Sequence, residues 1–429
     1  MKKYYKIPLL LSVLLSASTL QASNQWGAKN MGERYRPSRV WMEKFSSQAD
    51  IVAKGSIAEA IDSCDDVVGR YKYCVVDVSE GVLDGLVSIS RSRTKLIGTA
   101  NMDALTSNES GIFFSIGDNT QKVVIEGLNI EGHSVNSDEI YGIVVSGKNI
   151  KNIAILNNNI HNFDSDNNAH GIAVYGTGNS SRKGIKNVII QGNEVHDMRT
   201  GSSESIVING NVRRWEIKEN DVYDVNNIAI DAIGGEGTAP AKANKKGRIL
   251  PSRLDAARYG YIEDNYVENM HTLNNPAYGN EESWAAAIYI DGGHHIQVTN
   301  NVVINSAWGY EVGAENCVNS KHVSMVGNSA DDSTFGDLLL GGYAEVGFKK
   351  DQSINCNPNN TDDANEGHGY VNYLTVKENQ FNAQGSEESV TIQYRTTHAI
   401  VIQDGVEAVN DKGRGSARKD ENAIKTVED

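Results

Sequence analysis

Proline and cysteine are scarce in this 429-residue chain, which has only 6 of the first and 4 of the second. Few prolines, 41 glycines and evenly spread valine, isoleucine and asparagine are typical of a turn-rich chain of β-strands. No two cysteines have the Cys-x-x-Cys spacing, which argues against a cysteine-based metal site. Acidic residues outnumber basic ones by 55 to 40, and the net charge of −15 disfavours nucleic acid as a partner.

A short motif recurs seven times, usually as Asn, any residue, an apolar residue, any residue, and Asn or Asp. Its copies begin at Asn158, Asn193, Asn220, Asn265, Asn301, Asn328 and Asn379. The shortest intervals are 27 residues, and the longer ones contain extra loop. Repeats of this length are stacked units that bury a continuous core between neighbours. Since strands precede each copy, we predict an all-β fold, a single-stranded right-handed parallel β-helix.

The ends of the chain differ from this repeat. Residues 1–22 contain lysines, then an apolar stretch from Ile7 to about Leu15, then small residues up to Ala22. This pattern predicts a cleavable signal peptide that is too short for a membrane span, so we expect a secreted protein, extracellular or periplasmic. We expect the β-helix domain over residues 23–404 and a charged, mobile tail over 405–429.

Residues 56–63 have helical periodicity, and Ser56 is suited to cap the helix start. We expect this helix to cover the open end of the solenoid, whose strand edges would otherwise be exposed. In an exported protein four cysteines indicate two disulfides, and three pairings are possible. The simplest pairing is local, Cys64 with Cys74 and Cys317 with Cys356.

The strand before each motif indicates which side chains leave the core. Alternation places Ile230, Ala232, Ile288, Ile290, Tyr310 and Val312 inside. The residues between them form an outward column, Val144, Ala173, Val207, Asp231, Tyr289, Glu311, Leu339 and Thr391. A second outward column, two residues further on, contains Asp291. Polar residues concentrate in three neighbouring coils, which we interpret as a functional site, whereas the Asn motifs are predicted to be structural ladders.

Further candidates surround these columns. Glu236 follows Asp231 through two glycines, and Glu315 and His294 come just after their own strands, which we expect on the same side. His170 lies at the edge of this floor. Coil and strand spacings place the Cα atoms of Asp231 and Asp291 roughly 8 Å apart. Long loops at 237–257, which is basic, and 271–284 flank the acids, and long loops in a compact repeat are usually functional or disordered.

The runs 230–237, 254–261, 275–280, 288–293 and 309–315 carry a resemblance to a known family. Over roughly residues 50 to 400 the chain resembles the pectate-lyase-like superfamily of β-helix carbohydrate enzymes, and among them secreted bacterial lyases of biofilm matrix. The resemblance implies β-elimination on a uronate-containing exopolysaccharide.

Elimination needs a group that neutralises the substrate carboxylate and a base that removes the neighbouring proton. We expect Arg258 to be the neutralising group and Tyr278 or Tyr289 the acid or base, with His170 as a further choice. Four carboxylates would hold Ca²⁺ or bind hydroxyls, namely Asp231, Glu236, Asp291 and Glu311. Glu315 and His294 would contact substrate, and no organic cofactor is expected.

Two alternatives stay open. Asp231 and Asp291 at roughly 8 Å fall within the roughly 6.5–9.5 Å typical of inverting glycoside hydrolases, which need no metal. A net charge of −15 also repels a polyanion unless the groove is locally positive or bridged by calcium. The third possibility is a non-catalytic polysaccharide-binding solenoid, which has no need for clustered acids. In each case we expect a monomer whose partner is an extracellular polysaccharide.

Overall fold

The computed structural model describes residues 27–341, except 100, 244, 246–248 and 317, together with 369–382, 389–393, 396–403, 406–408 and 424–426. The expected signal peptide and the pair Cys317 and Cys356 lie outside the described residues.

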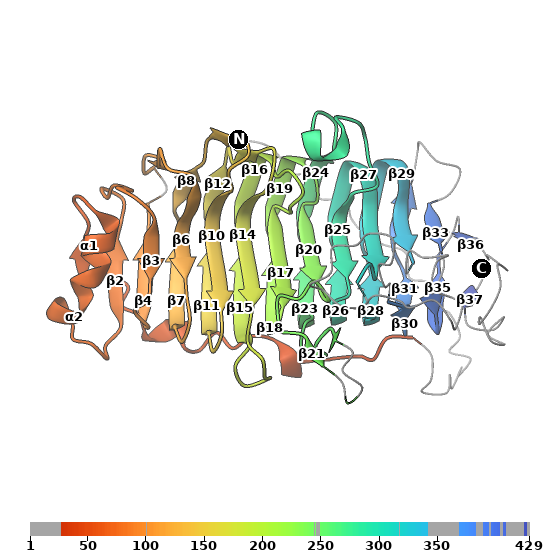
Figure 1. The fold of residues 1–429 in the computed structure, drawn as a ribbon, viewed down its shortest axis with the longest axis horizontal. Helices are drawn as coiled ribbons and strands as arrows, with labels where there is room; N and C mark the ends of the chain where they lie inside the picture. Colours follow the sequence, from red (N-terminus) through yellow and green to blue (C-terminus); the bar gives the residue numbers. More distant parts are fainter. Residues whose placement is uncertain are drawn as a thin grey trace, which may run out of the picture.

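The chain forms a parallel β-helix, as predicted, with three rows of strands around one core (Figure 1). The first row is a sheet of its own: β1 (Ile51–Val52), β2 (Cys74–Asp77), β4 (Thr94–Ile97), β7 (Gln121–Glu126), β11 (Lys151–Leu156), β15 (Ile185–Gln191), β18 (Val212–Lys218), β23 (Arg258–Glu263), β26 (His294–Thr299), β28 (Ser320–Val326), β31 (Thr375–Lys377), β35 (Ala399–Ile402) and β37 (Ile424–Thr426). Beside it lie β30 (Val371–Asn372) and β34 (Thr396–Thr397).

The second and third rows belong to one sheet. The second row contains β3 (Val87–Ile89), β6 (Gly111–Ile116), β10 (Ile140–Gly147), β14 (Ala169–Gly176), β17 (Ile206–Gly210), β20 (Ile230–Ile233), β25 (Ala286–Asp291), β33 (Val390–Ile392) and β36 (Val406–Ala408). The third contains β5 (Leu105–Thr106), β8 (Asn129–Glu131), β12 (Asn159–His161), β16 (Glu194–Arg199), β19 (Asp221–Asn226), β24 (Tyr266–Met270) and β32 (Gln380–Asn382), with β9 (Ser134–Val135) and β13 (Asp164–Ser165) beside it. Two long strands, β27 (Val302–Gly313) and β29 (Ser329–Leu340), run through both rows.

The core follows the predicted alternation. All six residues predicted to face inward in the coils around 230, 290 and 310 belong to one continuous cluster of buried apolar side chains. Valine and isoleucine fill most of this cluster, and their branched side chains pack well on pleated strands. The alternation in the second row therefore sends the intervening residues to the outside.

The Asn motifs are structural, as predicted. The amide of each first Asn accepts from the backbone and the side chain of the Asn one coil earlier, for example Asn193 Nδ2 to Asn220 Oδ1 at 2.9 Å. The ladder runs unbroken from Asn158 to Asn379. Left-handed backbone occurs at the last residue of the motif, such as Asn162 at φ 60° and Asp197 at φ 51°. The first Asn of the motif thus forms the buried ladder, and the last residue forms the turn.

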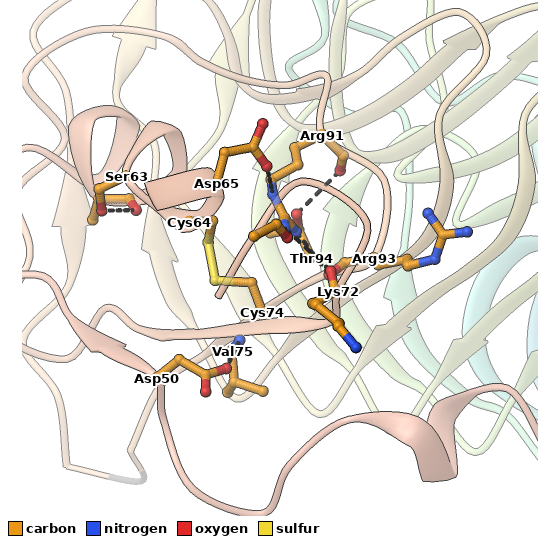
Figure 2. The surroundings of a disulfide bond; sticks show 12 residues. Asp50, Ser63, Cys64, Asp65, Lys72, Cys74, Val75, Arg91, Arg93 and Thr94 are labelled. Carbon is orange, nitrogen blue, oxygen red and sulfur yellow. Dashed lines mark hydrogen bonds and ion pairs between the residues drawn. A yellow bond between two sulfur atoms is a disulfide. The ribbon is translucent and has the colours of Figure 1, made fainter. Parts of the chain in front are cut away.

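The N-terminal cap contains two short helices, α1 (Ile57–Asp62) and α2 (Cys64–Val67). Ser56 caps α1 by accepting a hydrogen bond from Glu59 N at 3.3 Å, as predicted. The predicted disulfide Cys64–Cys74 joins α2 to β2. Figure 2 shows Arg91 beside it, bound to Asp65 at 2.8 Å and to the carbonyl of Lys72 at 3.1 Å.

Residues 27–45 form a strap along the outside of the first sheet, which the sequence analysis did not predict. Figure 1 shows it in red along the lower edge of the ribbon. It begins at the far coils, where Gly27 N donates to His398 O, and ends at the cap, where Phe45 packs on Tyr73. Short 3-10 turns occupy η1 (Glu33–Tyr35) and η2 (Met42–Lys44).

Strands continue beyond residue 404. β36 pairs with β33 and β37 pairs with β35, so the expectation of an unstructured tail over 405–429 is wrong for these two segments. Within the part of the chain that the structure describes, no helix is long and apolar enough to cross a membrane.

Candidate functional site

Six carboxyl groups gather on the outer side of the second row. We call them the acid cluster, namely Glu204, Asp231, Glu236, Asp291, Glu311 and Glu315. Asp231 on β20 pairs in register with Tyr289 on β25, which pairs with Glu311 on β27, so the predicted column is formed. The residues on either side of Asp231 and of Glu311 lie in the core cluster, so alternation directs these two side chains outward. Tyr289 packs outside the core, in a small cluster with Ala286, Trp308 and Leu339.

Pointing outward does not expose these groups, contrary to the expected solvent-facing patch. Asp231, Asp291 and Glu311 are 2%, 4% and 2% exposed, whereas Glu236 and Glu315 are exposed at the edge. At the edge of this face lies η3 (Pro276–Tyr278) of the loop over 271–284, which appears as the green turn above β24 and β27 in Figure 1. The cluster thus has a buried floor and an exposed rim.

The two aspartates on the floor tend to keep their protons. Burial raises the pKa of Asp231 well above its usual value, and Glu204 and Asp291 raise it further. Burial also raises the pKa of Asp291, with a contribution from Glu315. The groups that shift the two pKa values are carboxyls and backbone amides, and no cation is among them.

Hydrogen bonds distinguish the two aspartates. Asp291 accepts from the backbone N of Glu315 at 2.8 Å and from Asn316 Nδ2 at 3.4 Å. Asp231 accepts from the N of Ala232 at 2.5 Å. Since donors favour an ionised carboxylate, Asp291 is better suited to be the ionised member of the pair.

Glu204 belongs to the site, although the sequence analysis did not identify it. Burial raises its pKa to about 8, with Glu236 as the next contributor. His170 Nδ1 donates to the Glu204 carbonyl at 2.5 Å, and Tyr175 Oη lies 2.7 Å from His170 Nε2. Burial lowers the pKa of His170 to about 4, so its ring is neutral at neutral pH and positions Glu204.

A break in the alternation hid Glu204. Ala229 and Ala287 both lie in the core next to the inward residues Ile230 and Ile288, so two successive residues face inward. The preceding outward-facing residue of each coil therefore lies three residues before the column of Asp231, Tyr289 and Glu311, whereas strict alternation would place it two residues before. It carries Tyr141, His170, Glu204, Ile228, Ala286 and Trp308, and a search of that column would have found Glu204.

Both candidate tyrosines reach the acid cluster. Tyr289 Oη donates to Glu315 Oε1 at 2.9 Å, and Tyr278 Oη donates to Asn227 Oδ1 at 3.0 Å. Burial raises the pKa of Tyr278 to about 12, and Glu204, Glu315 and Asp231 also raise it. A phenol with this pKa is a hydrogen-bond donor at neutral pH and a poor base.

Arg258 and His294 do not join the acids, contrary to expectation. Both open strands of the first sheet, where they pair in register. Arg258 donates to the carbonyls of Leu254 and Ala256 at 3.0 Å and to Asn211 Oδ1 at 2.6 Å. After Gly292 the chain leaves the second row and enters the first sheet. Residues that follow the end of β25 therefore no longer lie on the face that carries the acid cluster. Arg258 therefore holds a loop, and nothing in its contacts places it near a substrate carboxylate.

The expected calcium site is not formed. In the described residues no three His, Cys, Asp or Glu side chains are arranged to hold a metal ion.

Sequence comparison finds one curated relative over part of the chain. The "Uncharacterized protein YwoF" of Bacillus subtilis (strain 168) is 37% identical over 227 residues, which is 52% of this chain and 44% of that protein. The match therefore covers less than half of the relative's length. No known family model matches the chain.

Structure comparison finds other solenoids. The A-module of the mannuronan C-5 epimerase AlgE6 of Azotobacter vinelandii has a TM-score of 0.39 at 11% identity, over 82% of this chain and 86% of that one. The catalytic domain of a GH87 alpha-1,3-glucanase in complex with nigerose has a TM-score of 0.37 at 13% identity, over 89% of this chain and 68% of that one. A DFA-IIIase of Arthrobacter chlorophenolicus A6 has a TM-score of 0.39 at 8% identity, over 89% of this chain and 98% of that one. Scores this low say nothing about the reaction of this chain.

Proposed function

We propose that this protein is a secreted carbohydrate-active enzyme that hydrolyses glycosidic bonds of an extracellular polysaccharide with inversion. The observation that carries the proposal is the pair Asp231 and Asp291, on adjacent coils, whose pKa values burial and neighbouring carboxyls raise. A carboxylic acid that stays protonated at neutral pH is what a general acid requires. The register between Asp231 and Tyr289 supports the spacing of roughly 8 Å between the two Cα atoms.

Asp231 is the proposed acid. Asp291 is the proposed base, because the hydrogen bonds from Glu315 N and Asn316 Nδ2 make it the member of the pair that loses its proton first. Asp231 gives its proton to the departing glycosidic oxygen, while Asp291 takes a proton from the water that attacks the anomeric carbon from the opposite face. The bond from the anomeric carbon to the glycosidic oxygen breaks, and one from that carbon to the water oxygen forms. The exposed Glu236 and Glu315 bind sugar hydroxyls at the rim, and Tyr278 and Tyr289 donate to the substrate.

Charge favours hydrolysis over the elimination that the family resemblance implies. Elimination builds negative charge beside a uronate carboxylate and requires a group that neutralises it. Arg258, the expected neutralising residue, is engaged on the other sheet, and six carboxyls in one cluster repel a polyuronate as soon as any of them ionises. A polymer of neutral sugars suits this site better than a polyuronate. A leader-like segment at 1–22 and the disulfide Cys64–Cys74 support export.

Product analysis tests the reaction class. The mature protein is incubated with a panel of neutral and uronate-containing exopolysaccharides, and new reducing ends and ultraviolet absorbance are recorded. Hydrolysis yields reducing ends alone, whereas elimination also yields an absorbing unsaturated uronate. An absorbing product would show that the enzyme is a lyase. If none of the polysaccharides is cleaved, a non-catalytic binding solenoid is favoured.

Substitution tests the two roles. Asp231→Asn and Asp291→Asn should each lower turnover by about 10²–10⁴-fold, the usual scale of acid or base catalysis. A substrate whose leaving group needs no proton should restore Asp231→Asn but not Asp291→Asn. The matched control is Asp221→Asn, an exposed aspartate on β19 of the third row. Near-normal activity in both cluster variants would place the chemistry elsewhere.

A further inference from the structure

A second candidate site lies on the first sheet, away from the acid cluster. One residue in each of ten successive coils has left-handed backbone there, with φ between 55° and 64°. In the order of the coils this column contains Arg93, Lys122, Asn152, Asn187, Arg214, Tyr259, His295, His322, Tyr373 and His398. The five successive coils from Tyr259 to His398 thus carry only tyrosine and histidine at this position.

The fold alone does not require these rings. Asparagine tolerates left-handed backbone better than tyrosine does, and Asn152 and Asn187 fill the same position in earlier coils. There they also bond to each other, Asn187 Nδ2 to Asn152 Oδ1, at 2.8 Å. Lysine and arginine occupy this position in the other earlier coils, so left-handed backbone is general along this sheet. What changes at Tyr259 is the side chain, from amide or basic residues to five successive rings, and this change points to a function in these five coils.

The five rings form a continuous ladder along the axis of the solenoid. Successive ring centroids are 5.1 Å apart for Tyr259 and His295, 4.5 Å for His295 and His322, 4.9 Å for His322 and Tyr373, and 5.0 Å for Tyr373 and His398. The last two pairs are stacked, with interplanar angles of 24° and 26°, whereas the first two are tilted by 49° and 59°. Each step of the ladder thus offers imidazole nitrogens or a phenol hydroxyl to a ligand beside it.

The strap faces this ladder and encloses a groove of about 980 Å³ with it. Lys29, Arg34 and Tyr35 line the groove from the strap, and His295, His322 and Tyr373 line it from the ladder. Tyr35 also stacks on Tyr259, with centroids 4.3 Å apart, which closes one end. We call this space the basic groove.

The charges around the basic groove are positive. Burial lowers the pKa of His295 and of His322 to about 4, and Lys29 and Lys321 lower both further. Arg34 also lowers the pKa of His295, and no carboxyl is among the groups that shift the pKa of either histidine. His322 Nδ1 is buried and has no hydrogen-bond partner among the described residues. A chain of net charge −15 thus keeps a cationic groove with an unused polar atom.

We propose that the basic groove binds an extended glycan that carries anionic groups, separately from the acid cluster. The lysines and Arg34 bind the anionic groups, and the edges of the rings bind hydroxyls. The rise of roughly 4.8 Å between coils is close to the length of one pyranose unit, so successive rings match successive sugars. A single small anion would not use a groove of this volume or a ladder of five rings.

Calorimetric titration with tetragalacturonate, maltotetraose and inorganic sulfate tests this proposal. Tetragalacturonate should bind more tightly than the uncharged maltotetraose, with an affinity that falls as salt is added. Combining Lys29→Gln with Arg34→Gln should weaken tetragalacturonate binding by about tenfold or more. Both residues are exposed, so this variant should fold normally.

Two further variants separate binding from a structural role. His322→Asn and Tyr373→Asn install the residue of the earlier coils, and each should weaken tetragalacturonate binding while the protein remains folded. Asp291→Asn, in the acid cluster, should leave this binding unchanged. Loss of thermal stability without loss of binding would show that the ladder is structural. Sulfate that binds as tightly as the tetramer would reduce the groove to a site for single anions, and either result overturns the proposal.

Discussion

Glu204 shows how one residue can couple the site to the stability of the protein. Its side chain is 14% exposed, it lies among other carboxyls, and it retains a proton up to a pH of about 8. The neutral His170 beside it cannot compensate a negative charge. Ionisation of Glu204 therefore opposes the folded state, and the same direction holds for Asp231 and Asp291, whose pKa values are also raised.

We expect the thermal midpoint to fall as the pH rises. An unfolded glutamate loses its proton near 4.5, whereas folded Glu204 loses it near 8, so the folded state binds more protons between these values. The stabilisation is complete below about pH 4.5 and is lost as the pH rises through about 8. Glu204→Gln should flatten this decline when melting is followed by calorimetry.

The control for this experiment is Glu109→Gln, which changes an exposed glutamate far from the cluster. It should leave the slope of melting temperature against pH unchanged. A slope that is the same in the wild type and in Glu204→Gln would contradict the raised pKa of this residue.

At the scale of the element, the Asn ladder decides how coils stay in register. Asn220 is fully buried and takes part in bonds to Asn193, Asn265 and the carbonyl of Ile190. An amide is suited to this position because it donates and accepts at once. An aspartate would lose the donor and bring a buried charge.

Asn220→Ala should therefore destabilise strongly. It leaves the side-chain N–H of Asn193 and the carbonyl of Ile190 unpaired, at a cost of about 1–3 kcal/mol for each buried group. Denaturant unfolding should show a lower midpoint. Asn159→Ala, which removes a partly exposed bond to Asn129 from a residue without left-handed backbone, should cost much less. Equal losses in the two variants would mean that burial is not what gives Asn220 its importance.

The stacking direction, the Asn ladder and the inward faces of the strands could be predicted from the sequence because each recurs in every coil. The column of Asp231, Tyr289 and Glu311 followed from the same repeat. Features that occur once could not be predicted this way. The burial of Asp231, which is 2% exposed, is such a feature, because alternation predicts only that the side chain leaves the core.

Arg258 and His294 illustrate a second reason why part of the site could not be predicted from the sequence. Alternation predicts which side of a strand a residue occupies, but not the row into which the chain turns at a corner. Both residues follow corners, one after Ala257 and one after Gly293, and both enter the first sheet. Neighbours in the sequence were therefore assigned to the wrong face.

At the scale of the whole molecule, the strap ties distant coils together. Arg36 forms an ion pair with Glu263 at 2.7 Å, and Arg39 pairs with the buried Glu216. Trp41 packs in a separate cluster with Val124, Ala154 and Ile189, from three successive coils. Repeat proteins usually contact only their nearest neighbours along the axis, and the strap adds longer connections.

Trp41→Ala should loosen these connections. Trp41 is 6% exposed, and removal of a buried tryptophan side chain costs about 3–5 kcal/mol when the site cannot collapse. We expect a lower unfolding midpoint and faster hydrogen exchange in β7, β11 and β15. Val40→Ala is the matched control, since Val40 is 64% exposed. Unchanged exchange in these three strands would show that the strap lies on the sheet without stabilising it.

The strap also limits how many coils the molecule can have. Its ends are fixed near β35 and near β2, and ten steps of the first sheet separate these strands, a span of roughly 48 Å. Residues 27–45 reach at most about 65 Å when fully extended, and two helical turns shorten them. Duplication of a coil, the ordinary route by which solenoids grow, would stretch the strap toward its limit. One added coil would bring the span to roughly 53 Å, within reach of a straightened strap, whereas four would exceed its full extension. Residues 27–45 thus set an upper bound on the number of coils that one strap can connect.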